Sequence, residues 1–210
     1  MEKRTAMKKY VAMCMALVFA LGAKAQIPEG LHVVALRMGD VTSLGPYTNV
    51  AVPTSLAYEY CFAENAFDVP SLCLGVGGVL GHASVSTLTT TVIDGSGRTD
   101  TRTETSRWFF GGLKGYAHYD VLSLVGVDAP QIDTYASLTL GTRIKKWTWK
   151  GENAPSASET ISSESTVWRR TPMVGIQVGA RYFIIPNVGV SLEVGYDGMS
   201  ILDFGLVASF

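Results

Sequence analysis

Strict alternation of apolar residues with small or polar ones, repeated along the chain, is the feature that most restricts the fold of this sequence. In the last segment Leu202, Phe204 and Leu206 alternate with Asp203 and Gly205. Successive side chains of a β-strand point to opposite faces, so a period of two indicates strands with one apolar face. No segment after residue 25 shows the i, i+3, i+4, i+7 repeat of an amphipathic helix. The pattern predicts an all-β protein.

Eight segments carry this pattern or are compatible with it. The four C-terminal segments are the clearest. In the third of the earlier segments the phase of the alternation changes near Gly77 and Gly78, which predicts a bulge or kink there. An even number of consecutive strands favours an up-and-down antiparallel meander closed into a barrel. The predicted strands are Leu31–Gly39, Thr54–Phe62, Leu72–Ser86, Arg107–Tyr119, Ile132–Arg143, Val174–Tyr182, Val188–Tyr196 and Leu202–Phe210.

The face opposite the apolar one distinguishes a transmembrane barrel from a soluble barrel or sandwich. A soluble sheet exposes long charged side chains to water, whereas the polar face here consists mainly of Gly, Ser and Thr with single charges. Such a face fits the narrow interior of an eight-stranded barrel, which side chains fill. Segments of about nine to eleven residues also match a membrane-crossing strand. We therefore predict an eight-stranded antiparallel transmembrane β-barrel with apolar side chains facing lipid.

Residues 1–25 have the three parts of a secretory signal peptide. A basic start precedes an apolar stretch from Tyr10 to Ala23, and Ala23-Lys24-Ala25 offers a small-residue cleavage site. We predict cleavage after Ala25, which leaves residues 26–210 as one barrel domain. Removing five basic residues and Glu2 changes the 17 Lys+Arg and 18 Asp+Glu of the whole chain to 12 and 17. An acidic exported domain has no electrostatic reason to bind nucleic acid.

The connections between the strands fall into two sets. Both ends of an eight-stranded chain lie on one side of the membrane, which export places in the periplasm. Two interpretations of the Ser/Thr-rich outer connections stay open. In one, strands 3–6 extend beyond the membrane as a sheet whose exposed edge binds another chain. In the other, these connections are solvated loops without a fixed partner. The predicted outer connections are Asp40–Pro53, Thr87–Ser106, Lys150–Thr166 and Asp197–Met199, and the periplasmic ones are Ala63–Ser71, Val121–Gln131 and Ile185–Asn187.

Aromatic residues gather near both ends of the predicted strands. Amphipathic rings favour the headgroup level of a membrane, so two such bands are interpreted as interfacial girdles. The outer band comprises Trp108, Trp147, Trp149 and Trp168, and the inner band comprises Tyr60, Phe62, Tyr119, Tyr182 and Phe210.

Several segments look like the strands of one known family. Gly179–Tyr196 resembles a penultimate hairpin, and the strand ending in Phe210 resembles a C-terminal assembly signal; Ser55–Tyr60, Leu74–Gly78 and Ile132–Gly141 look like further strands. These segments resemble the small bacterial outer-membrane barrels of the OmpA/OmpX-like, porin-type family. The resemblance implies the outer membrane of a Gram-negative bacterium, contact with its lipids including lipopolysaccharide, and recognition of Phe210 by the assembly machinery. It implies no chemistry, because this fold hosts many functions.

Alternation also places charged residues in the predicted interior. Buried charges must be paired or hydrated, and eight strands leave little bore, so a salt-bridged plug is favoured over a narrow ion path. Glu193, Arg181 and Asp203 lie on three consecutive strands and are predicted to cluster. The predicted lumen residues are Arg37, Glu59, Lys114, Arg143, Arg181, Glu193 and Asp203, with Asp133 near the inner mouth.

Cys61 and Cys73 flank a predicted hairpin centred near Phe67. That hairpin places the two cysteines opposite each other at a spacing that a disulfide can span, in an oxidising compartment. The sequence leaves three alternatives open for these cysteines: a structural disulfide, two free thiols and a redox switch. No matching His/Cys set lies nearby to complete a zinc site.

His82-Ala83-Ser84 is the one sequence feature that hints at catalysis. His82 and Ser84 share a face of a strand, and Glu104 is the nearest candidate for a third member, but a working site also needs an oriented base and an oxyanion donor. We predict a non-enzymatic, monomeric barrel without cofactor or metal, with a structural or surface-interaction role. The alternatives are a narrow porin-like channel for small solutes and a lipid A-modifying enzyme.

Overall fold

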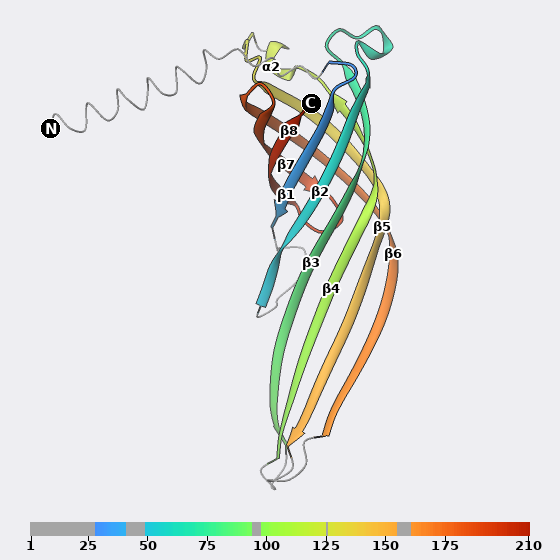
Figure 1. Cartoon of the computed structure of the whole chain (residues 1–210), viewed down its shortest axis with the longest axis vertical. Helices are drawn as coiled ribbons and strands as arrows, with labels where there is room; N and C mark the ends of the chain where they lie inside the picture. Colours follow the sequence, from blue (N-terminus) through green and yellow to red (C-terminus); the bar gives the residue numbers. More distant parts are fainter. Residues whose placement is uncertain (1–27, 41–48, 94–97, 125, 155–160) are drawn as a thin grey trace, which may run out of the picture.

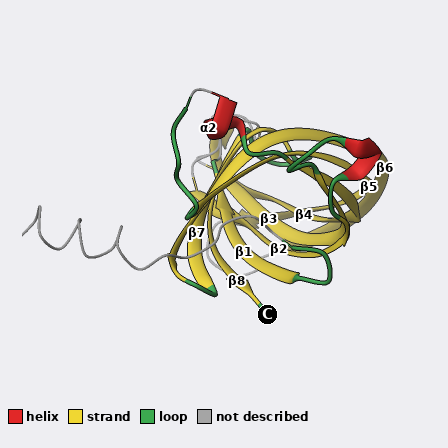
Figure 2. Cartoon of the chain, turned by 90° about the horizontal axis from the view of Figure 1, so that it is seen from above, coloured by secondary structure: helices red, strands yellow, loops and turns green. Residues whose placement is uncertain are grey.

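The computed structural model describes residues 28–40, 49–93, 98–124, 126–154 and 161–210, and the predicted signal peptide lies outside them. In this described part, eight strands form one closed barrel in which each strand pairs antiparallel with the next and β8 pairs with β1 (Figures 1 and 2). The predicted fold class is confirmed. The strands are β1 His32–Gly39, β2 Asn49–Ala63, β3 Cys73–Ile93, β4 Arg98–His118, β5 Ile132–Ala154, β6 Ile161–Ile185, β7 Val188–Tyr196 and β8 Leu202–Ser209.

Two helical turns, η2 Ala66–Asp68 and α2 Val121–Leu124, lie in the connections at the end of the barrel that carries the C-terminus (Figure 1). Among the described residues, no helix has the length and apolar character needed to cross a membrane.

The outer wall of the barrel is apolar. Val190 and Leu192 are each 40% exposed, Phe204 is 59% exposed and Leu206 is 63% exposed, so these side chains do not meet in a shared core. The same outward band continues around the barrel. In a closed barrel the backbone N–H and C=O groups of every strand are hydrogen-bonded to neighbouring strands. An apolar exterior around a polar interior is the arrangement that crosses an outer membrane. The chain is therefore an outer-membrane transmembrane barrel. Further members of the band are Leu36, Leu56, Leu80, Leu113, Leu140, Val174 and Ile176.

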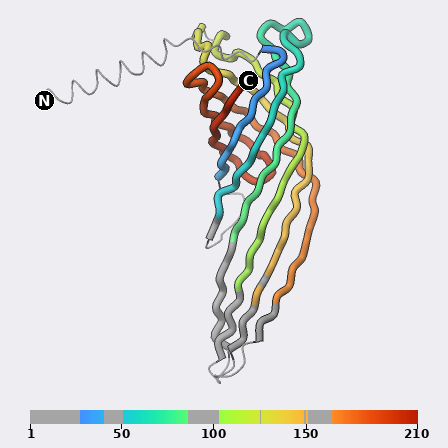
Figure 3. Tube along the Cα trace, in the orientation of Figure 1, coloured from blue at the N-terminus to red at the C-terminus, as the bar shows by residue number. Residues whose placement is uncertain are grey.

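The strands differ greatly in length. β1, β7 and β8 have 8 or 9 residues, whereas β3 to β6 have 21 to 25. A strand needs about 9–11 residues to cross a bilayer. β3 to β6 therefore continue past the other strands as a four-stranded sheet (Figure 3). Thr87–Ser106 and Lys150–Thr166, predicted as connections, lie largely in these strands.

The predicted bulge at Gly77 and Gly78 is wrong. β3 pairs with β4 without interruption from Cys73 to Ile93, and the register shifts occur in β2, between Ala51 and Thr54 and between Cys61 and Ala63. A Cβ atom on Gly77 would lie 1.8 Å from the carbonyl oxygen of Tyr58. Close approach of β2 and β3, rather than a bulge, therefore accounts for glycine at position 77.

Candidate functional site: the filled interior and the projecting sheet

The interior of the barrel is filled by two apolar clusters with a charged layer between them. The inner cluster surrounds the two cysteines at the end where the chain begins and ends. The outer cluster lies under the β7–β8 turn. The inner members are Val33, Ala35, Cys61, Cys73, Phe183 and Val207, and the outer members are Ala57, Val79, Ala83, Val85, Trp108, Phe110, Met173 and Met199.

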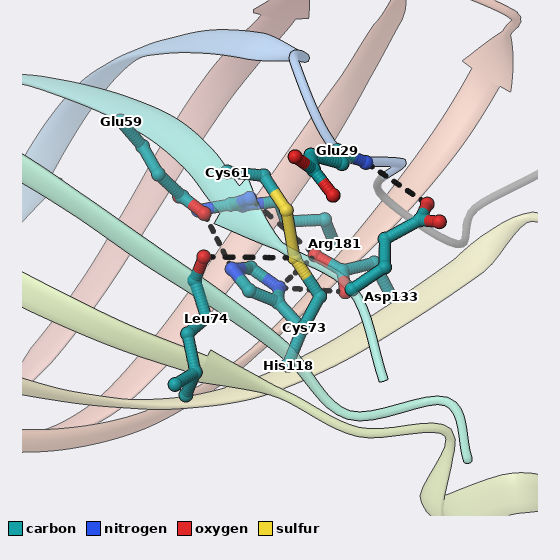
Figure 4. The surroundings of a disulfide bond; sticks show 9 residues. Glu29, Glu59, Cys61, Cys73, Leu74, His118, Asp133 and Arg181 are labelled. Carbon is teal, nitrogen blue, oxygen red and sulfur yellow. Dashed lines mark hydrogen bonds and ion pairs between the residues drawn. A yellow bond between two sulfur atoms is a disulfide. The ribbon is translucent and has the colours of Figure 1, made fainter. Parts of the chain in front are cut away.

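Arg181 is the centre of the first group of buried ions. Its guanidinium lies 2.5 Å from Glu59 Oε2 and 3.4 Å from Asp133 Oδ2, and its carbon atom Cζ lies 4.3 Å from the Tyr135 ring centroid. His118 directs Nδ1 to Asp133 Oδ1 at 2.9 Å and Nε2 to Glu59 (Figure 4). Carboxylate oxygens only accept hydrogen bonds, so the two nitrogens of His118 both act as donors.

Glu193 is the centre of the second group. It forms an ion pair with Arg37, whose Nη2 lies 2.7 Å from Glu193 Oε1. It accepts hydrogen bonds from Lys114 Nζ at 3.0 Å and from the Tyr135 hydroxyl at 2.5 Å. Because Tyr135 also contacts Arg181, this ring connects the two groups. The Lys114 ammonium also donates to Gln177 at 2.8 Å.

Asp203 lies at the end of this network. It accepts from Gln177 Nε2 at 2.8 Å and from Ser200 Oγ at 2.5 Å. Arg181 is therefore not bonded to Glu193 or Asp203, although the three residues were predicted to cluster. The strand register explains this, because Glu193 lies opposite Gly179 rather than opposite Arg181.

The predicted placement of Arg143 in this network is wrong. Arg143 is half-buried on β5 at the outer end of the barrel, where it donates to the Gly198 carbonyl at 3.0 Å and to the Tyr196 hydroxyl at 3.4 Å. Its position lies beyond the charged layer. His118, conversely, was not among the predicted lumen charges, although it shares a strand face with Lys114, and that shared face is the signal that identifies it.

These contacts close the bore of the barrel. β2 and β6 are diametrically opposite in the ring of eight strands, and the Arg181–Glu59 ion pair joins them across the lumen. The Lys114–Glu193 pair likewise joins β4 to β7. An ion path would have to break pairs that are fully desolvated, so this arrangement suits a rigid plug better than a conduit.

Cys61 and Cys73 form a disulfide at the inner end, with a Cα separation of 6.7 Å (Figure 4). They are not directly opposite, because Cys61 pairs with Gly75 in the sheet and the register shifts one residue later. The bond closes the β2–β3 connection beside the first ion group.

Trp108 does not belong to the outer aromatic girdle. It is 7% exposed and packs in the outer apolar cluster, because its strand position faces inward between Arg107 and Phe109. Trp168 faces outward and is 60% exposed, with Lys146 Nζ 5.3 Å from its ring centroid. Trp147 is half-buried, and the Trp149 side chain lies outside the described residues.

Aromatic side chains at the inner end surround His32. Its ring stacks on that of exposed Phe210 with centroids 5.6 Å apart, and its Nδ1 lies 2.7 Å from the Tyr58 hydroxyl. The remaining predicted members of the inner band are partly exposed: half-buried Tyr60, Tyr119 and Tyr182 and exposed Phe62.

His82 and Ser84 do not converge with Glu104. Both lie on the outward face of β3, where the His82 ring is 4.8 Å from that of Phe109. Glu104 shares its strand face with Ser106, which is buried inside. Side chains on opposite faces of one sheet cannot form a triad. Within the described residues, no group of three or more His, Cys, Asp or Glu side chains is arranged to hold a metal ion.

No protein-family model matches this sequence, and no curated protein matches it. Among solved structures, the chain is similar to the attachment invasion locus protein Ail of Yersinia pestis, solved with the heparin analogue sucrose octasulfate (12% identity, 87% of this chain and 97% of that chain, TM-score 0.44). It is similar to the N-terminal β-barrel domain of Pseudomonas aeruginosa OprF (14% identity, 87% of this chain and 98% of that chain, TM-score 0.40). It is also similar to a major outer membrane protein from Thermus thermophilus (15% identity, 87% of this chain and 100% of that chain, TM-score 0.47). These likenesses concern the fold alone.

Proposed function

We propose that this chain is a non-enzymatic, monomeric outer-membrane barrel that anchors a surface sheet. In this proposal the plugged barrel supplies rigidity, and the projecting sheet of β3 to β6 binds an extended segment of an extracellular protein along the free edge of β6. The role is mechanical display and recognition rather than transport.

The observation that carries the proposal is the unequal pairing of β6. On one side β6 pairs with β5 from Ile161 to Tyr182, whereas on the other side it pairs with β7 only from Ile176 onward. Residues 161–175 therefore present one row of backbone N–H and C=O groups that has no strand neighbour in the described part of the chain. Such a row is a template for an added strand. No proline interrupts residues 161–171.

Proline substitution tests the edge directly. Successive residues of an antiparallel strand direct their N–H groups to alternate sides, so Thr166→Pro and Val167→Pro remove one donor each on opposite sides of β6. One of the two variants loses a backbone N–H group that donates a hydrogen bond to β5, and its sheet is destabilised. The other variant loses only an N–H group that faces the open edge, and it keeps all its hydrogen bonds to β5.

The assay uses the full chain in lipid nanodiscs and a phage-displayed library of 12-residue peptides. We expect selected peptides to bind wild type and to lose binding to the proline variant whose amide hydrogen exchange in β5 is unchanged. A matched control is Thr148→Pro, which acts on the central strand β5. Failure to select any peptide that depends on the β6 edge would contradict strand addition.

The lipid A-modifying alternative receives no support from the interior, and among the described residues of β3 and β4 no carboxylate lies on the face that carries His82. A change in lipid acylation that requires His82, measured by mass spectrometry of lipid A from cells expressing wild type and His82→Ala, would overturn the non-enzymatic role. We expect identical lipid A from both.

A further inference from the structure

Four side chains form a basic and aromatic cluster on the outward face of the long strands. Arg107 on β4 lies opposite Lys146 on β5, and Lys146 lies opposite Trp168 on β6. Arg170 lies one outward position nearer the apolar band, opposite Ile144. We refer to Arg107, Lys146, Trp168 and Arg170 as the outer basic cluster.

The outer basic cluster lies at the headgroup level of the membrane. Alternation puts it on the same face as the lipid-facing Leu113, Leu140 and Val174. Arg170 precedes Tyr182 of the inner band by 12 residues along β6. At about 3.3 Å per residue and a tilt of about 40°, this stretch spans roughly 30 Å, the thickness of the hydrocarbon core. The cluster therefore borders the leaflet on the side away from the C-terminus.

The charges of the cluster have no acidic partner in the described part of the chain. Arg107 and Arg170 are exposed, and Lys146 is half-buried with its ammonium over the ring of Trp168. The nearest acidic residue on this face, Glu164, is bonded to Lys150 at 3.3 Å. Like charges directly opposite each other on neighbouring strands repel. An anion held between the three cations removes this repulsion.

We propose that the outer basic cluster binds the phosphate groups of a phosphorylated glycolipid in the outer leaflet. Guanidinium groups of Arg107 and Arg170 offer paired donors that match phosphate oxygens, and the Lys146 ammonium adds a point charge. Trp168 suits the interface, while Phe109 and Ile144 continue the apolar surface below for acyl chains. This site depends on the barrel spanning the membrane and is independent of strand addition to β6.

Matched double variants separate this site from general electrostatics. Lys146→Gln/Arg170→Gln removes two cations of the cluster. Lys145→Gln/Arg169→Gln removes one Lys and one Arg from the same two strands on the opposite face, and Lys145 also lies over a tryptophan, with Nζ 5.0 Å from the Trp108 ring centroid. Both variants change net charge equally. A shift in apparent size on unheated SDS gels shows that each variant is folded.

The full chain in neutral detergent micelles is titrated with diphosphoryl lipid A, with its dephosphorylated form and with inorganic phosphate, while Trp fluorescence and the thermal midpoint are followed. We expect diphosphoryl lipid A to raise the midpoint of wild type and of Lys145→Gln/Arg169→Gln. The apparent affinity of Lys146→Gln/Arg170→Gln is expected to fall about tenfold or more. Equal loss in both double variants, equal binding of the dephosphorylated lipid, or an equal effect of inorganic phosphate alone would each overturn the proposal.

Discussion

Arg181 is the residue on which the interior depends most. It is almost completely buried, and its guanidinium is the cation shared by Glu59 and Asp133. A buried ion pair adds little net stability by itself, because both charges lose water, but removing one partner leaves the other uncompensated. His118 alone then faces both carboxylates.

Arg181→Leu is therefore expected to lower the free energy of unfolding by about 3–5 kcal/mol. The control is Lys150→Leu, since Lys150 and Glu164 form an exposed pair with side chains 65% and 56% accessible, and its loss should cost less than about 1 kcal/mol. Urea unfolding in lipid vesicles, followed by tryptophan fluorescence, measures both. Equal midpoints for Arg181→Leu and wild type would show that the carboxylates find other compensation.

At the residue scale, alternation determines which face a side chain takes but not which partner it finds. The parity of Lys114 is sufficient to put it inside, because one face of every strand must meet lipid. Its bond to Glu193 on β7 depends on barrel stagger, which no local pattern encodes. The same reasoning explains Trp108, since a rule based on strand ends ignored the parity that buries it.

The β2–β3 connection is an element in which four residues other than glycine have left-handed backbone. Asn65, Phe67, Asp68 and Ser71 have φ between 48° and 66°. Asparagine and aspartate tolerate this region, whereas the left-handed backbone of a residue with a bulky side chain costs about 1–2 kcal/mol of conformational free energy. Phe67 is also highly exposed, so it gains little from burial.

Phe67→Gly is expected to stabilise the protein by about 0.5–1 kcal/mol, because glycine adopts positive φ freely and this gain exceeds its entropic cost. Val69→Gly is the matched control two residues later, where φ is −92°, and it should destabilise by a similar amount. Thermal midpoints in detergent, read by the gel shift of unheated samples, compare the two. The thermal midpoint must rise in Phe67→Gly and fall in Val69→Gly. A lower midpoint in both variants would refute the role of the positive φ at Phe67.

The disulfide constrains the same connection. Cys61 and Cys73 are 12 positions apart, and closing a loop of this length is expected to contribute about 3 kcal/mol through the unfolded chain. Cys61→Ser/Cys73→Ser should lower the urea midpoint accordingly, and dithiothreitol should lower the wild-type midpoint to nearly the same value. The double variant provides the control, because its midpoint should not respond to reductant.

At the element scale, the sequence indicates the strands well where they face lipid and poorly where they leave it. Hydrocarbon demands one apolar face, which produces the alternation in β7 and β8. Beyond the membrane, no lipid requires an apolar face on β3 to β6, so the sequence of residues 87–93 and 98–106 loses the apolar–polar alternation and retains only the strand preference of threonine. Their pairing depends on neighbouring strands, which a single segment does not reveal.

At the scale of the whole molecule, closure of the barrel and filling of its bore are two aspects of one geometry. β8 pairs with β1 over seven residues, so the ring has no open edge within the membrane. With eight strands, the enclosed space is only wide enough for side chains. Ion pairs that cross the lumen occupy the middle of that space, and the apolar cluster around Phe110 and Met173 occupies its outer end.

This geometry predicts that the intact protein passes no steady ionic current. Purified full-length protein, inserted into planar bilayers at moderate salt, should show no stable conductance steps, because ions would have to cross a desolvated plug and a dry cluster. A general porin inserted in the same bilayers is the positive control, and the gel shift shows that the sample is folded. Reproducible ohmic steps from the folded protein would mean that the Arg181–Glu59 contact opens readily. The narrow porin-like channel would then replace the anchor as the function of this barrel.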